Sequence, residues 1–140
     1  MLILDYLDQQ IEFEKKYGKN TLVLMQVGSF FEFYGVDNDQ EKIGNAKIIA
    51  EILNIQLTRR NKSILENSRN NCLMAGFPTH SLKRFIQILL SHQYTIVLIE
   101  QVTPPPNPKR DITQIFSPGT YIEEVTNYNP NNIVSLFLSI

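Results

Sequence analysis

The stretch VGSFFEFY places four aromatic rings and one acid within five consecutive positions. Because side chains alternate along a β-strand, Phe31 and Phe33 share one face, and Phe30, Glu32 and Tyr34 share the other. The first face is typical of a hydrophobic core. The second face presents a ring, an acid and a ring in a row, just past a glycine turn, which is the pattern of a binding surface.

A ring beside an acid has the chemistry needed to recognise disturbed base pairing. An aromatic side chain can insert at a base step, and unstacking costs less where the pairing is already damaged. The acid can accept a hydrogen bond from an exposed base, whereas its charge is repelled by intact duplex. On spacing alone a plainer interpretation stays open, in which Phe30 lies at the rim of the core and Glu32 faces solvent.

Basic residues could hold the phosphates on either side of such a site. Each basic group borders an apolar segment, and one isolated pair is typical of a solvated helix or strand end. Near turns, several such groups together suggest an edge that follows a phosphate backbone. The groups are Arg59, Arg60 and Lys62; Lys83 and Arg84; and Lys109 and Arg110.

Residue types for catalysis or metal binding are sparse. The two histidines and one cysteine have no C-x-x-C or H-x-x-H spacing. Neither a G-x-S-x-G nucleophile elbow nor a G-x-x-x-x-G-K-[ST] phosphate loop occurs. We therefore predict no catalytic residue, metal site or cofactor in this chain, and we expect Cys72 to be a buried hydrophobic residue. Glu100 and Asp111 could serve a metal-dependent nuclease, so a nuclease-like α/β enzyme remains the rival class.

The elements that position these residues are expected from the sequence pattern. Apolar segments typical of strands alternate with segments of helical spacing, which predicts an α/β fold with a mixed β-sheet flanked by helices. Gly28-Ser29 forms either a two-residue type II′ hairpin turn or a kink in one long strand. The segment 94–102 is expected to be a central strand buried on both faces. Three consecutive prolines make 103–111 irregular. Further strands are expected at 21–27, 30–34, 55–60, 72–77 and 133–140, helices at 2–16, 43–54 and about 82–89, and a turn at 117–120.

Length and composition indicate one globular domain. The chain has 140 residues, of which 43% are hydrophobic and 19% charged, and its net charge is -1. A domain that binds nucleic acid strongly by itself is usually basic, so we expect weak DNA binding by this chain alone. The amino-terminal segment lacks the features of a signal peptide, and no apolar run approaches the ~20 residues of a membrane span. These features predict an intracellular protein without membrane association.

Five motifs in this order resemble the mismatch-recognition domain of the MutS family of DNA mismatch-repair proteins. GSFFEFYG is similar to the family's G-[DE]-F-[YF]-E-x-[YF]. LTRR, MAGFPTH, VLIEQV and SPGT are similar to its L-T-x-R, M-A-G-[IV]-P-x-H, V-A-[IV]-x-E-Q and T-P-G-T. The resemblance covers residues 1 to about 120 and implies the fold of MutS domain I. Ser29 departs from it, because it replaces the usual acid.

The resemblance also implies roles for individual residues. Phe30 matches the phenylalanine that wedges into the minor groove and stacks on the mispaired base, and Glu32 matches the glutamate that hydrogen-bonds that base. The resemblance implies contacts with the DNA backbone, or flanking positions, for Arg59, Arg60, Lys109 and Arg110. Residues 1–120 would form the recognition domain, and 121–140 would form the linker and first strand of a connector domain.

A longer protein is expected around this chain. The family resemblance implies that domains beyond residue 140 bind ATP and Mg²⁺, that the full-length protein is a dimer, and that its partner is double-stranded DNA with mismatches or small loops. The chain itself is expected to have no enzyme activity. Its asparagine- and isoleucine-rich composition suggests a viral or organellar branch. A protein-interaction domain that reuses the fold, with FFEFY as a docking strand, is the other alternative.

Overall fold

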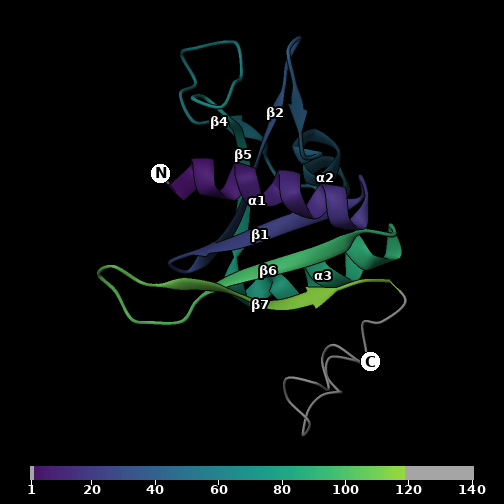
Figure 1. Cartoon of the computed structure of the whole chain (residues 1–140), viewed down its shortest axis with the longest axis vertical. Coiled ribbons are helices and arrows are strands. Elements are labelled where there is room, and N and C mark those ends of the chain that lie inside the picture. The colour runs from purple at the N-terminus through teal and green to yellow at the C-terminus, as the bar shows by residue number, and fades with distance from the viewer. Residues whose placement is uncertain (1, 119–140) are drawn as a thin grey trace, which may run out of the picture.

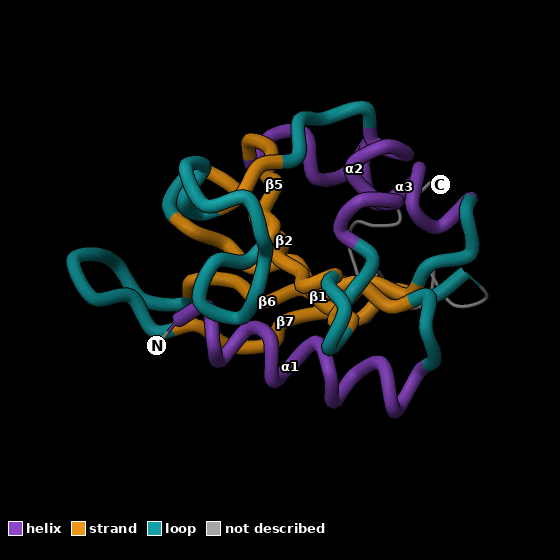
Figure 2. Tube along the Cα trace, turned by 90° about the horizontal axis from the view of Figure 1, so that it is seen from above, coloured by secondary structure: helices purple, strands orange, loops and turns teal. Residues whose placement is uncertain are grey.

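The computed structural model describes residues 2–118, which form one mixed sheet with helices on both of its faces (Figures 1 and 2). The helices are α1 (Leu2–Tyr17), α2 (Ala46–Leu53), α3 (Leu82–Ser91) and the short 3-10 helix η1 (Thr79–Ser81). The strands are β1 (Thr21–Val27), β2 (Phe30–Asp37), β3 (Lys42–Ile43), β4 (Thr58–Arg59), β5 (Leu73–Pro78), β6 (Thr95–Gln101) and β7 (Arg110–Phe116).

The sheet has the order β4-β5-β2-β1-β6-β7, with β3 paired to β2. β1 and β6 run parallel, and the other pairs are antiparallel. Helix α1 covers one face of the sheet, and α2 and α3 cover the other (Figure 2). Ile96, Val97 and Leu98 of β6 are all buried, which confirms the prediction of a strand covered on both sides. The predicted mixed α/β architecture is therefore confirmed.

A two-residue hairpin joins β1 to β2. Val27 pairs with Phe30 in an antiparallel register, so Gly28 and Ser29 form the loop between them. Gly28 takes a φ of 61°, a conformation that costs glycine little and other residues considerably more. The hairpin interpretation is confirmed, and the alternative of a single kinked strand is wrong.

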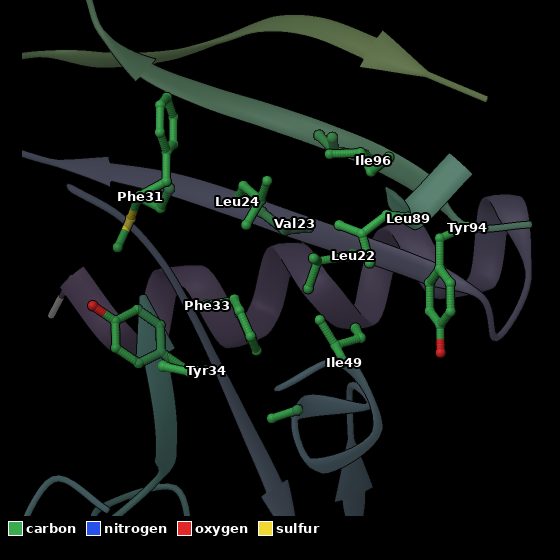
Figure 3. Packing of buried hydrophobic residues seen from close by; sticks show 14 of the residues in the cluster. Leu22, Val23, Leu24, Phe31, Phe33, Tyr34, Ile49, Leu89, Tyr94 and Ile96 are labelled. Atoms are coloured by element: carbon green, nitrogen blue, oxygen red, sulfur yellow. The ribbon is translucent and has the colours of Figure 1, made fainter. Parts of the chain in front are cut away.

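The core forms where β1 and β6 meet the helices (Figure 3). Phe31 and Phe33 are buried, as alternation predicts, and Cys72 is buried as well. Tyr34 was expected on the outward face beside Glu32, but it is only 3% exposed. The reason is α1, because the ring of Tyr6 packs edge-on against the ring of Tyr34 at a centroid distance of 5.0 Å.

Two predicted element boundaries are wrong for local reasons. Ile43, expected in the second helix, pairs with Val36 as part of β3, because Gly44 takes a φ of 74° and separates it from the helix. The predicted strand 55–60 shrinks to Thr58–Arg59. The N–H of Ile55 instead donates to the carbonyl of Ala50 at the end of α2.

The end of the predicted irregular segment 103–111 is also corrected. Arg110 and Asp111 belong to β7, where they pair with Gln101 and Glu100. The prolines precede Lys109, so from Lys109 onward the backbone has the donors that a strand needs. The predicted turn lies partly, and the last strand and segment 121–140 entirely, outside the described residues. Within residues 2–118, no helix is long and apolar enough to cross a membrane.

Candidate nucleic-acid interface

Phe30 and Glu32 lie together at the hairpin end of β2, on the face of the sheet that carries α1. The side chain of Phe30 is 46% exposed, although the strand behind it is buried. Helix α1 packs on this face at Tyr34, two positions beyond Glu32. A shallow hollow of about 260 Å³ opens beside Phe30 and Glu32, with Lys62, Met74 and Gly76 among its walls. The pair therefore borders an accessible concave surface.

The carboxylate of Glu32 is held by its neighbours on the sheet. The hydroxyl of Tyr34 donates a hydrogen bond to its Oε1. Gly76 is the partner of Glu32 across the β2–β5 ladder, and a Cβ at that position would lie 3.1 Å from Cγ of Glu32. Burial, and then the hydrogen bond to Glu32, raise the pKa of Tyr34 well above its usual range. Tyr34 consequently remains a protonated donor at physiological pH.

Side-chain amides fasten the hairpin that carries Phe30. The N–H of Gly28 donates to Oε1 of Gln101 at 2.6 Å, and the N–H of Gln101 donates to Oε1 of Gln26 at 2.9 Å. Nε2 of Gln26 donates to the carbonyl of Gly28 at 3.1 Å. Sequence reasoning missed these two glutamines, although Gln101 lies inside the motif VLIEQV. The motif is the signal that could have found it.

The other side of the hairpin is anchored to β5 and η1. Phe30 pairs with Pro78 at the end of β5. The N–H of Thr79 donates to the carbonyl of Ser29 at 2.8 Å. The backbone that carries Phe30 is thus held by hydrogen bonds on both sides, from β6 through Gln101 and from η1 through Thr79.

Of the predicted basic residues, Arg59 ends β4 and Arg60 begins the loop that follows it. Nε of Arg59 donates to the carbonyl of Ile64 at 2.8 Å, and Nη2 donates to the carbonyl of Lys62 at 3.0 Å. Arg59 therefore shapes the loop, and Arg60 is exposed on it. Lys62, from the same basic group, lines the hollow beside Phe30. The sequence placed Lys62 among the basic groups, but the family resemblance implied no role for it.

The second predicted basic pair lies at the end of the long loop between β6 and β7, which extends away from the sheet (Figure 1). Lys109 is exposed. Arg110 is directed into the hairpin network: its Nε donates to the carbonyl of Gln26 at 2.7 Å, and its Nη2 lies 3.3 Å from Oε1 of Gln101. The two neighbours thus differ, because Arg110 is engaged by the protein and Lys109 extends toward solvent.

The third basic group and the two acids considered for a nuclease lie elsewhere. Lys83 and Arg84 are on α3, and the guanidinium of Arg84 stacks on Phe85. Glu100 and Asp111 occupy partner positions in β6 and β7, and Glu100 accepts a hydrogen bond from the hydroxyl of Thr113. Over the part of the chain that the structure describes, no three His, Cys, Asp or Glu side chains are grouped as metal ligands.

Comparisons with known proteins show which family this chain is similar to. The family model for MutS domain I matches residues 7–125. A DNA mismatch repair protein mutS homolog of Acanthamoeba polyphaga mimivirus is 28% identical over 135 residues, which is 96% of this chain and 12% of that protein. The DNA mismatch repair protein MutS of Streptococcus gordonii is 31% identical over 132 residues, which is 91% of this chain and 14% of that protein.

The matches cover nearly all of this chain but only a small part of each relative. The chain spans about an eighth of the length of these relatives, so they contain long segments that have no counterpart in it. Within the chain, the match to the family model includes β2 with Phe30 and Glu32, the hairpin before it, and β6 with Gln101. Since the model covers most of its residues, this chain belongs to the MutS domain I family.

Proposed function

We propose that this chain recognises mispaired or looped-out bases in double-stranded DNA as part of a mismatch-repair protein. The observation that carries the proposal is the half-exposed ring of Phe30 beside the acid of Glu32, on a hairpin fixed by hydrogen bonds. Membership of the MutS domain I family and the names of the relatives support it.

The proposed role of Phe30 is to insert at a base step from the minor groove. A phenyl ring can stack on a base and kink the duplex, at a cost of a few kcal/mol that falls where pairing is already lost. Selection arises because a mispaired step deforms more easily than a paired one. A ring on a fixed backbone suits this task, since it loses little conformational freedom on insertion.

The proposed role of Glu32 is to test the base on which Phe30 stacks. Its carboxylate accepts a hydrogen bond from a base donor that has lost its normal partner. At a correctly paired step the Watson–Crick donors are already engaged by their partner bases, and the charge of Glu32 is repelled by the phosphates. Ring and acid thus contribute different parts of the discrimination.

Phosphate contacts would come from the loops on either side of the pair. Lys62 lines the hollow beside Phe30, Arg60 is exposed on the same loop, and Lys109 is exposed on the loop between β6 and β7. Arg59 and Arg110 are proposed to hold these loops and the hairpin in shape, because their guanidinium groups donate to backbone carbonyls. The net charge of -1 supports weak binding by the chain alone.

We propose that the rest of the activity resides in a longer protein of which this chain is one part. The relatives are about eight times as long as the aligned segment, which leaves room for domains that bind ATP and Mg²⁺ and form a dimer. The chain itself is proposed to have no enzyme activity and no cofactor.

The test is Phe30→Ala in the full-length protein. Mismatch preference, measured as the ratio of dissociation constants for matched and mismatched duplexes, should fall to near one. The affinity for matched duplex and its salt dependence should stay unchanged, because the phosphate contacts are intact. Tyr17→Ala is the matched control, since Tyr17 is 40% exposed and lies at the far end of α1. Retention of the preference in Phe30→Ala would overturn the proposal.

Phe30→Ala and Glu100→Gln together separate the rival functions. Loss of binding to a partner protein, with no change in DNA binding, would favour a protein-interaction domain. Metal-dependent cleavage of DNA that is abolished by Glu100→Gln would favour the nuclease-like enzyme. Neither result is expected.

A further inference from the structure

We propose that Tyr34 is a positioning residue for base reading, whose hydroxyl holds the carboxylate of Glu32 in the orientation that meets the mispaired base. The inference rests on the proposed function, because it assigns a second residue to the same recognition step. It concerns a side chain that is itself buried and would not touch DNA.

The first support is the contact between the two side chains. Tyr34 and Glu32 are two residues apart on β2, so their side chains project from the same face of the strand. The hydroxyl of Tyr34 donates to Oε1 of Glu32. A hydrogen bond to an ionised carboxylate is stronger than one between neutral groups, and it restrains the direction of the acceptor.

The second support is that the donor is itself fixed. The ring of Tyr34 is 3% exposed and stands at 81° to the ring of Tyr6, with the centroids 5.0 Å apart. A ring packed in this way has one position for its hydroxyl. A tyrosyl hydroxyl is protonated at physiological pH, and burial moves the pKa of Tyr34 further above that range.

The third support is the space opposite Glu32. Its cross-strand partner is Gly76, and a Cβ there would lie 3.1 Å from Cγ of Glu32 and 3.0 Å from the carbonyl of Phe31. The glycine therefore leaves room for the glutamate to lie along the sheet toward Tyr34. The absence of a side chain at Gly76 and the hydroxyl of Tyr34 favour the same orientation.

The contact with Tyr34 leaves the carboxylate able to read a base. An ionised carboxylate has about four acceptor positions, and Tyr34 occupies one of them. Without the hydroxyl, Glu32 would rotate about its side-chain bonds, and fixing it on a base would cost conformational entropy. The expected effect of losing the hydroxyl is weaker discrimination, with binding to matched duplex little changed.

The test compares four forms of the full-length protein: wild type, Tyr34→Phe, Glu32→Ala and the double variant. Tyr34→Phe should lower the mismatch preference by roughly three- to tenfold, which is the range for the net loss of one ordinary hydrogen bond, because Tyr34 acts on the base only through Glu32. In the Glu32→Ala background, the same change should have no further effect. Tyr94→Phe is the matched control, because it removes another buried tyrosyl hydroxyl, whose hydrogen-bond partner is Asn45 and which lies outside the contacts of Tyr34 and Glu32.

A spectroscopic measurement separates positioning from a loss of stability. With ¹³C-labelled glutamate, the carboxyl resonance of Glu32 should shift in Tyr34→Phe and stay in place in Tyr94→Phe. Equal losses of preference in Tyr34→Phe with and without Glu32 would overturn the inference, as would an unshifted resonance. If Glu32→Ala itself left the mismatch preference intact, the proposed role of Glu32 would fail, and this inference would fail with it.

Discussion

The N–H of Gly28 donates to Oε1 of Gln101 at 2.6 Å, although the two residues are 73 positions apart in the chain. This hydrogen bond joins the hairpin that carries Phe30 to the end of β6. Gln101→Ala should therefore loosen the hairpin, lower the free energy of unfolding by about 1 kcal/mol and reduce mismatch preference. Hydrogen exchange at Gly28 and binding to matched and mismatched duplexes would measure both effects.

The control for Gln101→Ala is Gln87→Ala, because Gln87 is exposed on α3, on the other side of the sheet. It should alter neither measurement. Rapid exchange at Gly28 already present in the wild-type protein would show that the hydrogen bond does not fasten the hairpin.

Lys109 and Arg110 are adjacent in sequence, but we predict different effects for them. Lys109→Ala should weaken binding to all duplexes alike and lower the slope of log affinity against log salt by about one. Arg110→Lys keeps the charge but cannot reproduce the planar contacts to Gln26 and Gln101, so it should reduce mismatch preference and leave the salt slope unchanged. The measurement is a salt titration of both variants with matched and mismatched duplexes. Equal salt slopes and equal mismatch preferences in the two variants would contradict this division of roles.

Glu32→Ala should change the two kinds of duplex in opposite directions. Affinity for matched DNA should rise roughly two- to fivefold at low ionic strength, because one negative charge near the phosphates is removed. Affinity for mismatched DNA should fall with the loss of the base contact. Glu51→Ala makes the same charge change at an exposed position on α2. Weaker binding of Glu32→Ala to matched DNA in a gel-shift titration would contradict the repulsion argument.

Gly76→Ala tests the space that Glu32 occupies. The new methyl group would press on Cγ of Glu32 and on the carbonyl of Phe31, so we expect a loss of about 1–3 kcal/mol in the free energy of unfolding. Mismatch preference should fall further than stability alone explains, since the carboxylate is displaced. Denaturant unfolding and duplex binding on the same sample would measure both. A variant that is destabilised but discriminates like wild type would show that Glu32 can move without consequence.

Local pattern was sufficient to predict much of the fold. Strict alternation placed Phe31 and Phe33 in the core, and the glycine before the strand indicated a hairpin. The apolar run of β6 predicted a strand covered on both faces. These features depend on near neighbours in the chain, and the structure agrees with them.

The rest could not be read from the sequence because it depends on distant partners. Tyr34 is buried because α1 folds across β2 and brings Tyr6 to it. Arg59 and Arg110 read as phosphate ligands because they are basic and lie near turns. The structure adds that their guanidinium groups donate to backbone carbonyls, whose positions only the folded chain defines. Lys62 lies beside Phe30 because the loop after β4 folds back toward β2, which the local sequence does not indicate.

The hydrogen bonds of Gln26, Gly28 and Gln101 also have a kinetic consequence. A protein that searches DNA remains at each base step only briefly. If the hairpin had to become ordered before Phe30 could insert, the protein would leave most steps before testing them. Because the backbone of the hairpin that carries Phe30 is held in place beforehand, an encounter can test the step beneath it without first ordering the loop. On the proposed function, association with matched and mismatched DNA should then be equally fast, and the two duplexes would differ in how long the protein stays.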